Sequence, residues 1–441
     1  MTALPLLVFV AAILAQARFP GQRLQIVVSG AAFALLALAL AGGHPRAVLA
    51  ALQWDVLIIL SALGVVSRVL AESHVFTRLA VAVTRLIGAS PTALVPVVAV
   101  SMFLVSGLVN NITALVLVLP VVLAILQLAG TTARHLRWTM GSLLVACNLG
   151  GAATPIGDFP AVLLLGAGAM DFVGYLRLAL PTATVGLLVF VTLVMVIVRP
   201  SRDVPVDLLR RKVTVAVVEG LHARIRVRRR FLVPGVLALA GMLTAWVLLP
   251  ATSGIPVYLV AWLGAGMLVL TLGRRGRDAV LDGVDLDATL FLFGLLVMVG
   301  AVRETGLFGY VARTLHDLPL PLPAQLALFV SVAGVSTGMF SAGPSMAAML
   351  EVAAPLAAAV GPEAVYVGLA FGVCAGSSLF LTAATAGPLA QSMIDRAGLT
   401  DAAGERLDFS FSTFLPVGAL AFAVILTAGI GAAIVISSYG R

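Results

Sequence analysis

The chain has 441 residues, of which 61% are hydrophobic and only 10% are charged. Apolar runs long enough to cross a bilayer recur from one end to the other. A water-soluble chain of this length would fold as two or three domains with charged surfaces, and the charge present is too little to coat even one. The composition therefore excludes a soluble protein and predicts an all-α polytopic membrane protein.

The net charge of +8 comes almost entirely from arginine, since Lys212 is the only lysine. The basic residues cluster between apolar runs, without interleaved aromatic residues, so they indicate membrane topology and not nucleic-acid binding. The two cysteines, Cys147 and Cys374, lie in apolar segments far apart, with no CxxC motif and no nearby histidine. We therefore expect packing cysteines, and no cofactor beyond a coupling Na⁺ or H⁺.

Each apolar run must be helical, because lipid offers the backbone no hydrogen-bond partners. The first apolar run has no basic leader, which favours a first span over a removed signal. The expected spans are 3–17, 24–42, 54–72, 137–168 and 177–198, then 231–249, 255–272, 288–304, 365–394 and 410–437. Two longer stretches, 92–126 and 321–356, carry polar residues at mid-length and are predicted to be re-entrant helical hairpins.

The segment 199–230, "RPSRDVPVDLLRRKVTVAVVEGLHARIRVRRR", contains ten Arg or Lys residues. The positive-inside bias predicts that this linker is cytoplasmic. Counting spans outward from it places both chain termini on the external side. The expected location is a bacterial-type inner membrane.

The two sets of spans resemble each other. The segments "WDVLIILSALGVVSRVLAESHVF", from Trp54, and "LDATLFLFGLLVMVGAVRETGLF", from Leu286, align without a gap. Five spans and a hairpin in each half make the second half run upside down, which predicts inverted repeats over 1–198 and 231–441. Chance alignment of apolar helices is the alternative. Inverted repeats are typical of secondary transporters with a site at the bilayer midplane.

Polar residues interrupt an apolar run at "CNLGGAATPIGDFPAVLL", Cys147 to Leu164. A helix broken from Gly150 to Gly157 would free carbonyls that suit a cation, and amides after Pro155 or Asp158 that suit an anion. Small residues that only pack between helices are the alternative. The candidate binding residues here are Asn148, Gly150, Gly151, Thr154, Gly157 and Asp158.

A matching interruption follows in the second half, at "CAGSSLFLTAATAGPLAQ", with Ser377, Ser378, Thr382 and Thr385 as candidates. The expected hairpin tips add Asn110, Asn111 and Thr113 in the first half, and Ser341 and Ser345 in the second. Their oxygens are hard ligands, and a Na⁺ site is expected at Asn111, Thr113 and Asp158. Hydrogen bonds between helices, without a ligand, are the alternative.

The segments "SGLVNNITALVLVLP" and "NLGGAATPIGDFPAVLL" resemble the ion transporter superfamily, which includes arsenite permeases, D-type Na⁺/H⁺ antiporters, the P protein and dicarboxylate or citrate carriers. The resemblance implies binding roles for Asn111, Thr113, Asn148, Gly150, Gly151, Thr154, Gly157 and Asp158, and it implies a homodimer. Asn110 departs from the pattern, because several branches have aspartate there. The second tip, "FSAGPS", also lacks the Asp-Asn pair that relatives often show.

Few acids are expected at membrane depth, namely Asp158, Glu351 and Glu304, and a buried acid there is costly unless it is paired or functional. Amide-rich tips and helix N-termini favour an ion-coupled secondary transporter that moves a small anion or oxyacid by alternating access. A Na⁺/H⁺ antiporter is the alternative, followed by a channel. An enzyme is not expected, because an intramembrane aspartyl protease needs a second facing aspartate.

Overall fold

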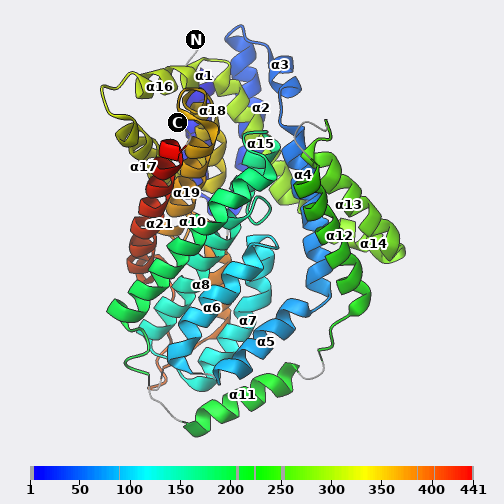
Figure 1. Ribbon diagram of the computed structural model, residues 1–441, viewed down its shortest axis with the longest axis vertical. Coiled ribbons are helices and arrows are strands. Elements are labelled where there is room, and N and C mark those ends of the chain that lie inside the picture. Colours follow the sequence, from blue (N-terminus) through cyan, green and yellow to red (C-terminus); the bar gives the residue numbers. More distant parts are fainter. Residues whose placement is uncertain are drawn as a thin grey trace.

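The computed structural model describes residues 4–88, 90–204, 208–222, 225–249, 254–384, 386–401 and 403–439 (Figure 1). These residues form helices and no strand. Ten of the described helices are long and apolar enough to cross a bilayer. The chain is therefore an integral membrane protein, as its composition predicts.

The first half contains α1 to α10. Their bounds are α1 Leu4–Arg18, α2 Arg23–Leu40, α3 Pro45–Ala50, α4 Trp54–Glu72, α5 Val75–Ile87, α6 Pro91–Ser106, α7 Asn111–Ala129, α8 Ala133–Ala153, α9 Phe159–Gly166 and α10 Phe172–Leu193. A π-helical turn, Val194–Val198, continues α10.

Helix α11, Leu208–His222, lies between the halves, and α12 to α21 follow. Their bounds are α12 Arg229–Leu248, α13 Val257–Leu272, α14 Arg274–Gly283, α15 Leu286–Arg303, α16 Leu307–His316, α17 Leu322–Phe340, α18 Ala342–Val360, α19 Pro362–Leu379, α20 Ala386–Ala397 and α21 Phe411–Tyr439.

The two halves repeat the same order of long and short helices, and their packing is paired as well. Helix α6 packs on α8 as α17 packs on α19, and α13 packs on α4 as α2 packs on α15. The short helices α5 and α16 have equivalent places in this order, and Figure 1 shows α5 near the lower end and α16 at the upper end. This arrangement fits an inverted repeat, although the orientation of each half in a membrane stays a prediction.

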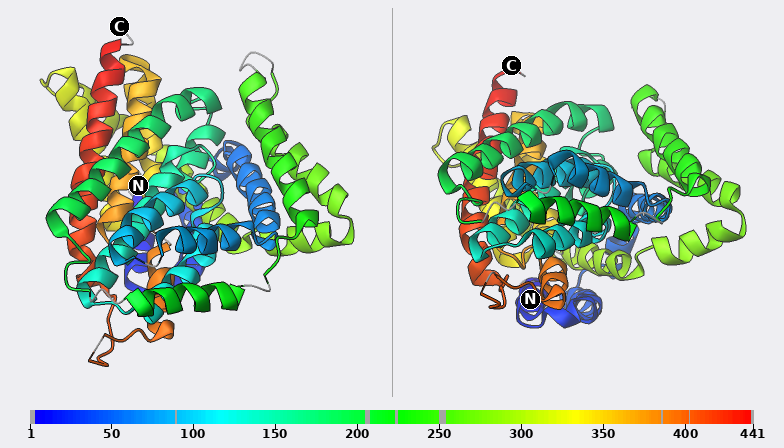
Figure 2. Two further views of the ribbon diagram at one scale, coloured as in Figure 1. Left: turned by 60° about the horizontal axis from the view of Figure 1, so that its bottom comes forward. Right: turned by 90° about the horizontal axis from the view of Figure 1, so that it is seen from below.

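The helices gather into two groups. Helices α1 to α4 pack with α12 to α15, and α6 to α10 pack with α17 to α21. Figure 2 shows α12, α13 and α14 standing to one side of the main body. Contacts of α9 with α4, and of α18 with α15, join the two groups. The candidate site lies along this junction.

The first helix break is present but begins later than predicted. The helix continues through Gly150 and Gly151, and residues 154–158 are non-helical. Thr154 has φ −128° and ψ 151°. It precedes Pro155, and a proline disfavours the helical conformation at the residue before it. The predicted span 137–168 is therefore two helices, α8 and α9.

The second break is also shifted. Gly376, Ser377 and Ser378 are helical residues of α19, and the chain leaves the helix at Phe380. A methyl group on Gly376 would lie 2.2 Å from the Gly334 carbonyl oxygen, so this glycine permits close helix packing. The predicted span 365–394 is therefore divided between α19 and α20.

Several short helices were not anticipated from the sequence. The expected linker 199–230 contains α11, and α12 begins at Arg229 within it, while the bounds of the two repeats stay a prediction. The predicted hairpins 92–126 and 321–356 are the helix pairs α6–α7 and α17–α18. Since α7, α17 and α18 are long enough to cross a bilayer, the re-entrant character of both hairpins stays a prediction.

Candidate functional site

The first hairpin tip is held by side chains that were expected to bind a ligand. The side-chain oxygen of Asn110 accepts a hydrogen bond from the Ile112 amide at 2.9 Å and so caps α7. The Ser106 hydroxyl contacts both the Asn111 side-chain oxygen and the Cys147 carbonyl oxygen. Asn111 is therefore buried at the tip, whereas Asn110 is only half-buried, and the ligand-binding role of both residues stays a prediction.

The helix break fits against this tip. The Thr154 hydroxyl donates to the Gly107 carbonyl oxygen at 2.7 Å. The Tyr175 hydroxyl donates at 2.8 Å to the carbonyl oxygen of Ala152, which lies in the last turn of α8. On the other side of the break, Asp158 Oδ1 accepts from the Phe159 amide at 2.8 Å and caps α9. Backbone groups freed by the break are thus partly satisfied within the protein.

Three glycines allow the break and the tip to approach this closely. A methyl group on Gly150 would lie 2.3 Å from the Phe103 carbonyl oxygen, and one on Gly157 would lie 2.7 Å from the Ser106 carbonyl oxygen. A methyl group on Gly151 would meet Asp158 Cβ at 2.6 Å. Because these residues have no side chain, the helix break can pack directly against the hairpin tip.

Asn148 joins the two halves. Its Nδ2 donates to the Ser377 carbonyl oxygen at 3.3 Å and to the Ser378 hydroxyl at 3.1 Å. Both serine hydroxyls in turn donate to carbonyls of their own helix, at Val373 and Cys374. The structure therefore brings these sequence-predicted residues of α8 and α19 together.

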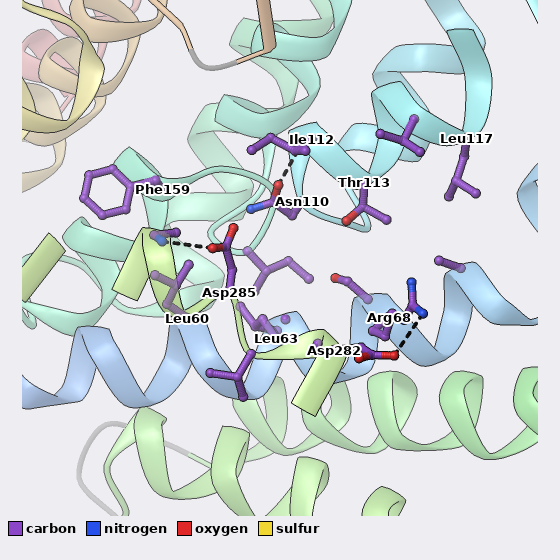
Figure 3. Close-up of a pocket in the computed structure, with 18 of the residues that line it drawn as sticks. Leu60, Leu63, Arg68, Asn110, Ile112, Thr113, Leu117, Phe159, Asp282 and Asp285 are labelled. Atoms are coloured by element: carbon purple, nitrogen blue, oxygen red, sulfur yellow. Dashed lines mark hydrogen bonds and ion pairs between the residues drawn. The ribbon is translucent and has the colours of Figure 1, made fainter. Parts of the chain in front are cut away.

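A cavity of about 830 Å³ lies where the tip, the break, α4 and the α14–α15 turn meet. Figure 3 shows Asn110 and Thr113 on one side of it, and Arg68 with Asp282 on the other. Gly157 and Asp158 of the helix break also line the cavity. Four of the expected site residues thus line one cavity, which is large enough for a small organic solute.

The other end of the cavity is charged. Arg68 forms ion pairs of 3.2 Å with Glu72 and with Asp282. Among the described residues, five carboxyl side chains and two guanidinium groups line the cavity. The acids are Glu72, Asp158, Asp282, Asp285 and Asp287, and the guanidinium groups belong to Arg68 and Arg228. The lining is therefore acidic and attracts cations.

His74 also lines this end, in the turn between α4 and α5. Burial, with Arg228 beside it, lowers the pKa of His74 from its ordinary value, against the opposing effect of Glu72. The imidazole is therefore mainly neutral at pH 7 and adds little positive charge.

Sequence reasoning missed the charged residues of this cavity. Arg68, Asp282 and Asp287 were not among the candidate site residues. The only sequence signal for this part of the lining was the alignment of the two repeats, which covers α4 and the start of α15. Their meeting depends on the packing of α14 against α4, which no local pattern encodes.

The second tip does not line this cavity. Ser341 has φ 79°, and the neighbouring Ala342 amide donates to the Ala383 carbonyl oxygen at 3.3 Å, so tip and break meet here too. Ser345 is buried, and its hydroxyl has no hydrogen-bond partner in the part of the chain that the structure describes. Thr382 is exposed, and its carbonyl oxygen accepts from Arg23 at 3.4 Å. Thr385 lies outside the described residues.

The Phe159 ring lies between the cavity and this second tip. It lines the cavity, and its Cε1 would be 3.3 Å from a methyl group on Gly343. The two tips are thus neighbours across one aromatic ring, not parts of a single described cavity.

The other expected membrane acids lie away from the cavity. Glu351 forms an ion pair of 3.4 Å with Arg303, beside a separate cavity of about 470 Å³. Glu304 caps the end of α15. Among the described residues, no group of three or more His, Cys, Asp or Glu side chains is placed to hold a metal ion.

The model of the citrate transporter family matches this chain over residues 9–376 and again over 251–437. An uncharacterized transporter of Mycobacterium tuberculosis is 28% identical over 352 residues, which are 79% of this chain and 80% of that protein. The magnetosome protein MamN of Magnetospirillum gryphiswaldense is 26% identical, over 83% of this chain and 82% of MamN.

A plant protein is also similar. Sodium/proton antiporter 1 of Arabidopsis thaliana is 25% identical over 274 residues, which cover 59% of this chain and 43% of the antiporter. Among solved structures, the YdaH transporter of Alcanivorax borkumensis matches with a TM-score of 0.59 and 17% identity, over 88% of this chain and 85% of YdaH. That likeness concerns the fold alone. Together the comparisons indicate a role in membrane transport rather than catalysis.

Proposed function

Because the chain belongs to the citrate transporter family, we propose that it is an ion-coupled secondary active transporter that carries a small anion or oxyacid by alternating access. The proposal rests above all on the cavity of about 830 Å³ that ends at the first hairpin tip and the helix break. The first turn of α9 borders this space through Phe159 and Val162, and Asp158 caps its N-terminus. The half-buried Asn110 and Thr113 add polar groups that can bind oxygen atoms.

The charge of the cavity limits the form in which an anion enters. A free tricarboxylate would be repelled by five carboxyl groups that only two arginines oppose. We propose that the anion enters together with one or more cations, which the acidic lining concentrates. Citrate is the first substrate to test, since the family is named for it.

Na⁺/H⁺ antiport is the second candidate. It is favoured by the acidic lining, by the half-buried Asp158 at the base of the cavity, and by the similarity to the plant antiporter. An ionisable group at membrane depth is what proton exchange requires. Asn110 weighs against it, because an amide does not titrate at the tip position where antiporter relatives tend to have an acid.

Proteoliposomes separate the two candidates. Radiolabelled citrate uptake is measured with an inward Na⁺ gradient, with an inward H⁺ gradient and with neither, and internal pH is followed in parallel without citrate. We expect gradient-driven citrate uptake and no Na⁺-driven pH change in its absence. A Na⁺-driven pH change without any uptake of citrate, succinate, phosphate or arsenite would replace the first proposal with the second.

We also propose how the chain is oriented in the membrane. The described C-terminal end of α21 lies near the top of Figure 1 and α11 lies at the bottom, which supports a linker and a C-terminus on opposite sides. We place the basic linker 199–230 in the cytoplasm of a bacterial cell and both termini outside, in a homodimer within the inner membrane.

A further inference from the structure

A second, much smaller cavity lies at the helix break and shares Asp158 with the large one. It is lined by Asn148, Ala152, Asp158, Pro160, Ala161, Tyr175, Ala370, Cys374 and Ser377, and we call it the inner chamber. Its volume is about 10 Å³, on the scale of the space that one water molecule or one small ion needs. Except for Asp158, every residue of this lining is buried.

The inner chamber offers hydrogen-bond acceptors and almost no donors. Asn148 Nδ2 donates to Ser377 and Ser378, and among the described residues the buried Asn148 side-chain oxygen has no hydrogen-bond partner. The Ser377 hydroxyl donates to its own helix, and the Tyr175 hydroxyl donates to Ala152. Their oxygen lone pairs, the Asn148 side-chain oxygen and the acceptor capacity that Asp158 keeps beside its bond from the Phe159 amide remain for a ligand.

This donor set distinguishes a cation from water. A water molecule needs acceptors for its two hydrogens and also a donor for its own oxygen, and the lining supplies at best the weak thiol donor of Cys374. A monovalent cation needs only oxygen ligands, and amide, hydroxyl and carboxylate oxygens are hard ligands of the right kind. A carboxylate among the ligands favours Na⁺ or Li⁺ over K⁺, because a smaller ion lies closer to the negative charge.

We infer that the inner chamber is a sodium site, with Asn148, Ser377, Tyr175 and Asp158 as its oxygen ligands. Asp158 is the one described residue that lines both cavities, so it links this site to the substrate pathway. Asn148 and Ser377 come from opposite halves, and a bound ion therefore ties α8 to α19. The inference rests on the proposed function in that this ion would be the coupling ion.

The test is thermal unfolding of the purified full-length protein in NaCl, LiCl or KCl, with choline chloride holding the ionic strength constant. A ligand that binds only the folded state raises the melting temperature as its concentration rises. We expect Na⁺ to stabilise the protein and K⁺ not to do so. Ser377→Ala removes one ligand and keeps the backbone carbonyl that Asn148 uses, so it should raise the half-effective Na⁺ concentration about ten-fold.

Asn148→Ala should abolish the response. If that variant does not fold, the Na⁺ response of Ser377→Ala tests the sodium site. Thr182→Ala is the matched control, because it also removes a helical hydroxyl that donates four residues back, at 2.7 Å, and Thr182 does not line the inner chamber. Its Na⁺ response should equal that of the wild type.

Equal stabilisation by K⁺, no stabilisation by Na⁺, or wild-type Na⁺ responses in Ser377→Ala would each overturn the sodium site. Citrate uptake by the wild type is measured independently. If uptake is observed without this Na⁺ response, only the sodium site fails. If the Ser377-dependent Na⁺ response is observed and no anion is carried, the sodium site stands and the proposed substrate class fails.

Discussion

Asp158 has two roles in this structure. Its Oδ1 caps α9, and the residue lines both the large cavity and the inner chamber. The geometry is compatible with a capping carboxylate and a ligand-binding carboxylate at once. Substitutions that keep the cap and remove the charge can separate the two roles.

Asp158→Asn retains a side-chain oxygen that can accept from the Phe159 amide, and asparagine caps helices about as well as aspartate. We expect the melting temperature to stay within a few degrees of the wild type, while gradient-driven uptake falls at least ten-fold. Asp171→Asn is the control, since Asp171 is an exposed residue at the start of α10 without a capping hydrogen bond. Uptake by Asp158→Asn at the wild-type rate would show that the carboxylate only caps.

Gly151→Ala tests the close fit of tip and break. The added methyl group would meet Asp158 Cβ at 2.6 Å and the Asn111 side-chain oxygen at 2.7 Å. Such overpacking costs about 1–3 kcal/mol, so we expect a lower melting temperature and a loss of transport. In Gly186→Ala, the nearest atom would be at 3.6 Å, an ordinary contact, and this variant should be as stable as the wild type. Equal stability of both variants would contradict the close packing of the hairpin tip against the helix break.

The site residues that sequence reasoning identified are those with a local signature. Asn110, Thr113, Gly157 and Asp158 are polar residues or glycines in apolar runs, and all four line the large cavity. Arg68 and Asp282 have no such signature, because a charged residue near a helix end is ordinary. Only the packing of α4 against α14 places them opposite the tip.

At the scale of elements, the break after α8 is stabilised by a helix from outside the α8–α9 pair. The Tyr175 hydroxyl of α10 donates to the Ala152 carbonyl oxygen, which lies just before the break. Within a membrane protein this carbonyl has no water to replace the bond. The break therefore depends on α10 as well as on Pro155.

Tyr175→Phe removes this donor and leaves a buried acceptor unsatisfied. We expect a loss of about 1–3 kcal/mol in the free energy of unfolding, measured as a lower denaturation midpoint. Tyr310→Phe is the control, because Tyr310 is 64% exposed and its replacement should change stability by less than about 0.5 kcal/mol. Equal effects of the two substitutions would show that the bond to Ala152 contributes nothing.

The existence of both breaks could be predicted from the sequence, and their positions could not. Glycine and serine runs marked Gly150 and Gly376, yet both residues are helical, because each lies where two helix backbones touch. The position of the first break follows instead from Pro155. The short helices α5 and α16 were missed since they are too short and too mixed in character to resemble membrane spans.

At the scale of the whole molecule, the cavity lies at the junction of the two helix groups, and its charge comes mainly from α4, α14 and α15. The Arg68 ion pairs are half-exposed, and such pairs contribute only about 0–1 kcal/mol to stability. Their importance is therefore electrostatic, through the field that a charged solute meets on entering.

Arg68→Ala makes the cavity more acidic. We expect the melting temperature to change little, and the KM for citrate to rise roughly three- to ten-fold at low salt and by less at high salt. Asp282→Asn changes the charge in the opposite direction and should lower the KM. Shifts of the same sign in the two variants would mean that cavity charge does not govern substrate entry.

The central claim is that the solute occupies the cavity at the first tip, and the most direct test is substrate protection of Thr113→Cys. Both native cysteines are buried, so a small maleimide should label only the new thiol of the purified protein. We expect citrate with Na⁺ to slow labelling several-fold, while chloride salts at equal ionic strength do not. Labelling at the same rate with and without citrate, in a variant that still transports it, would contradict the account.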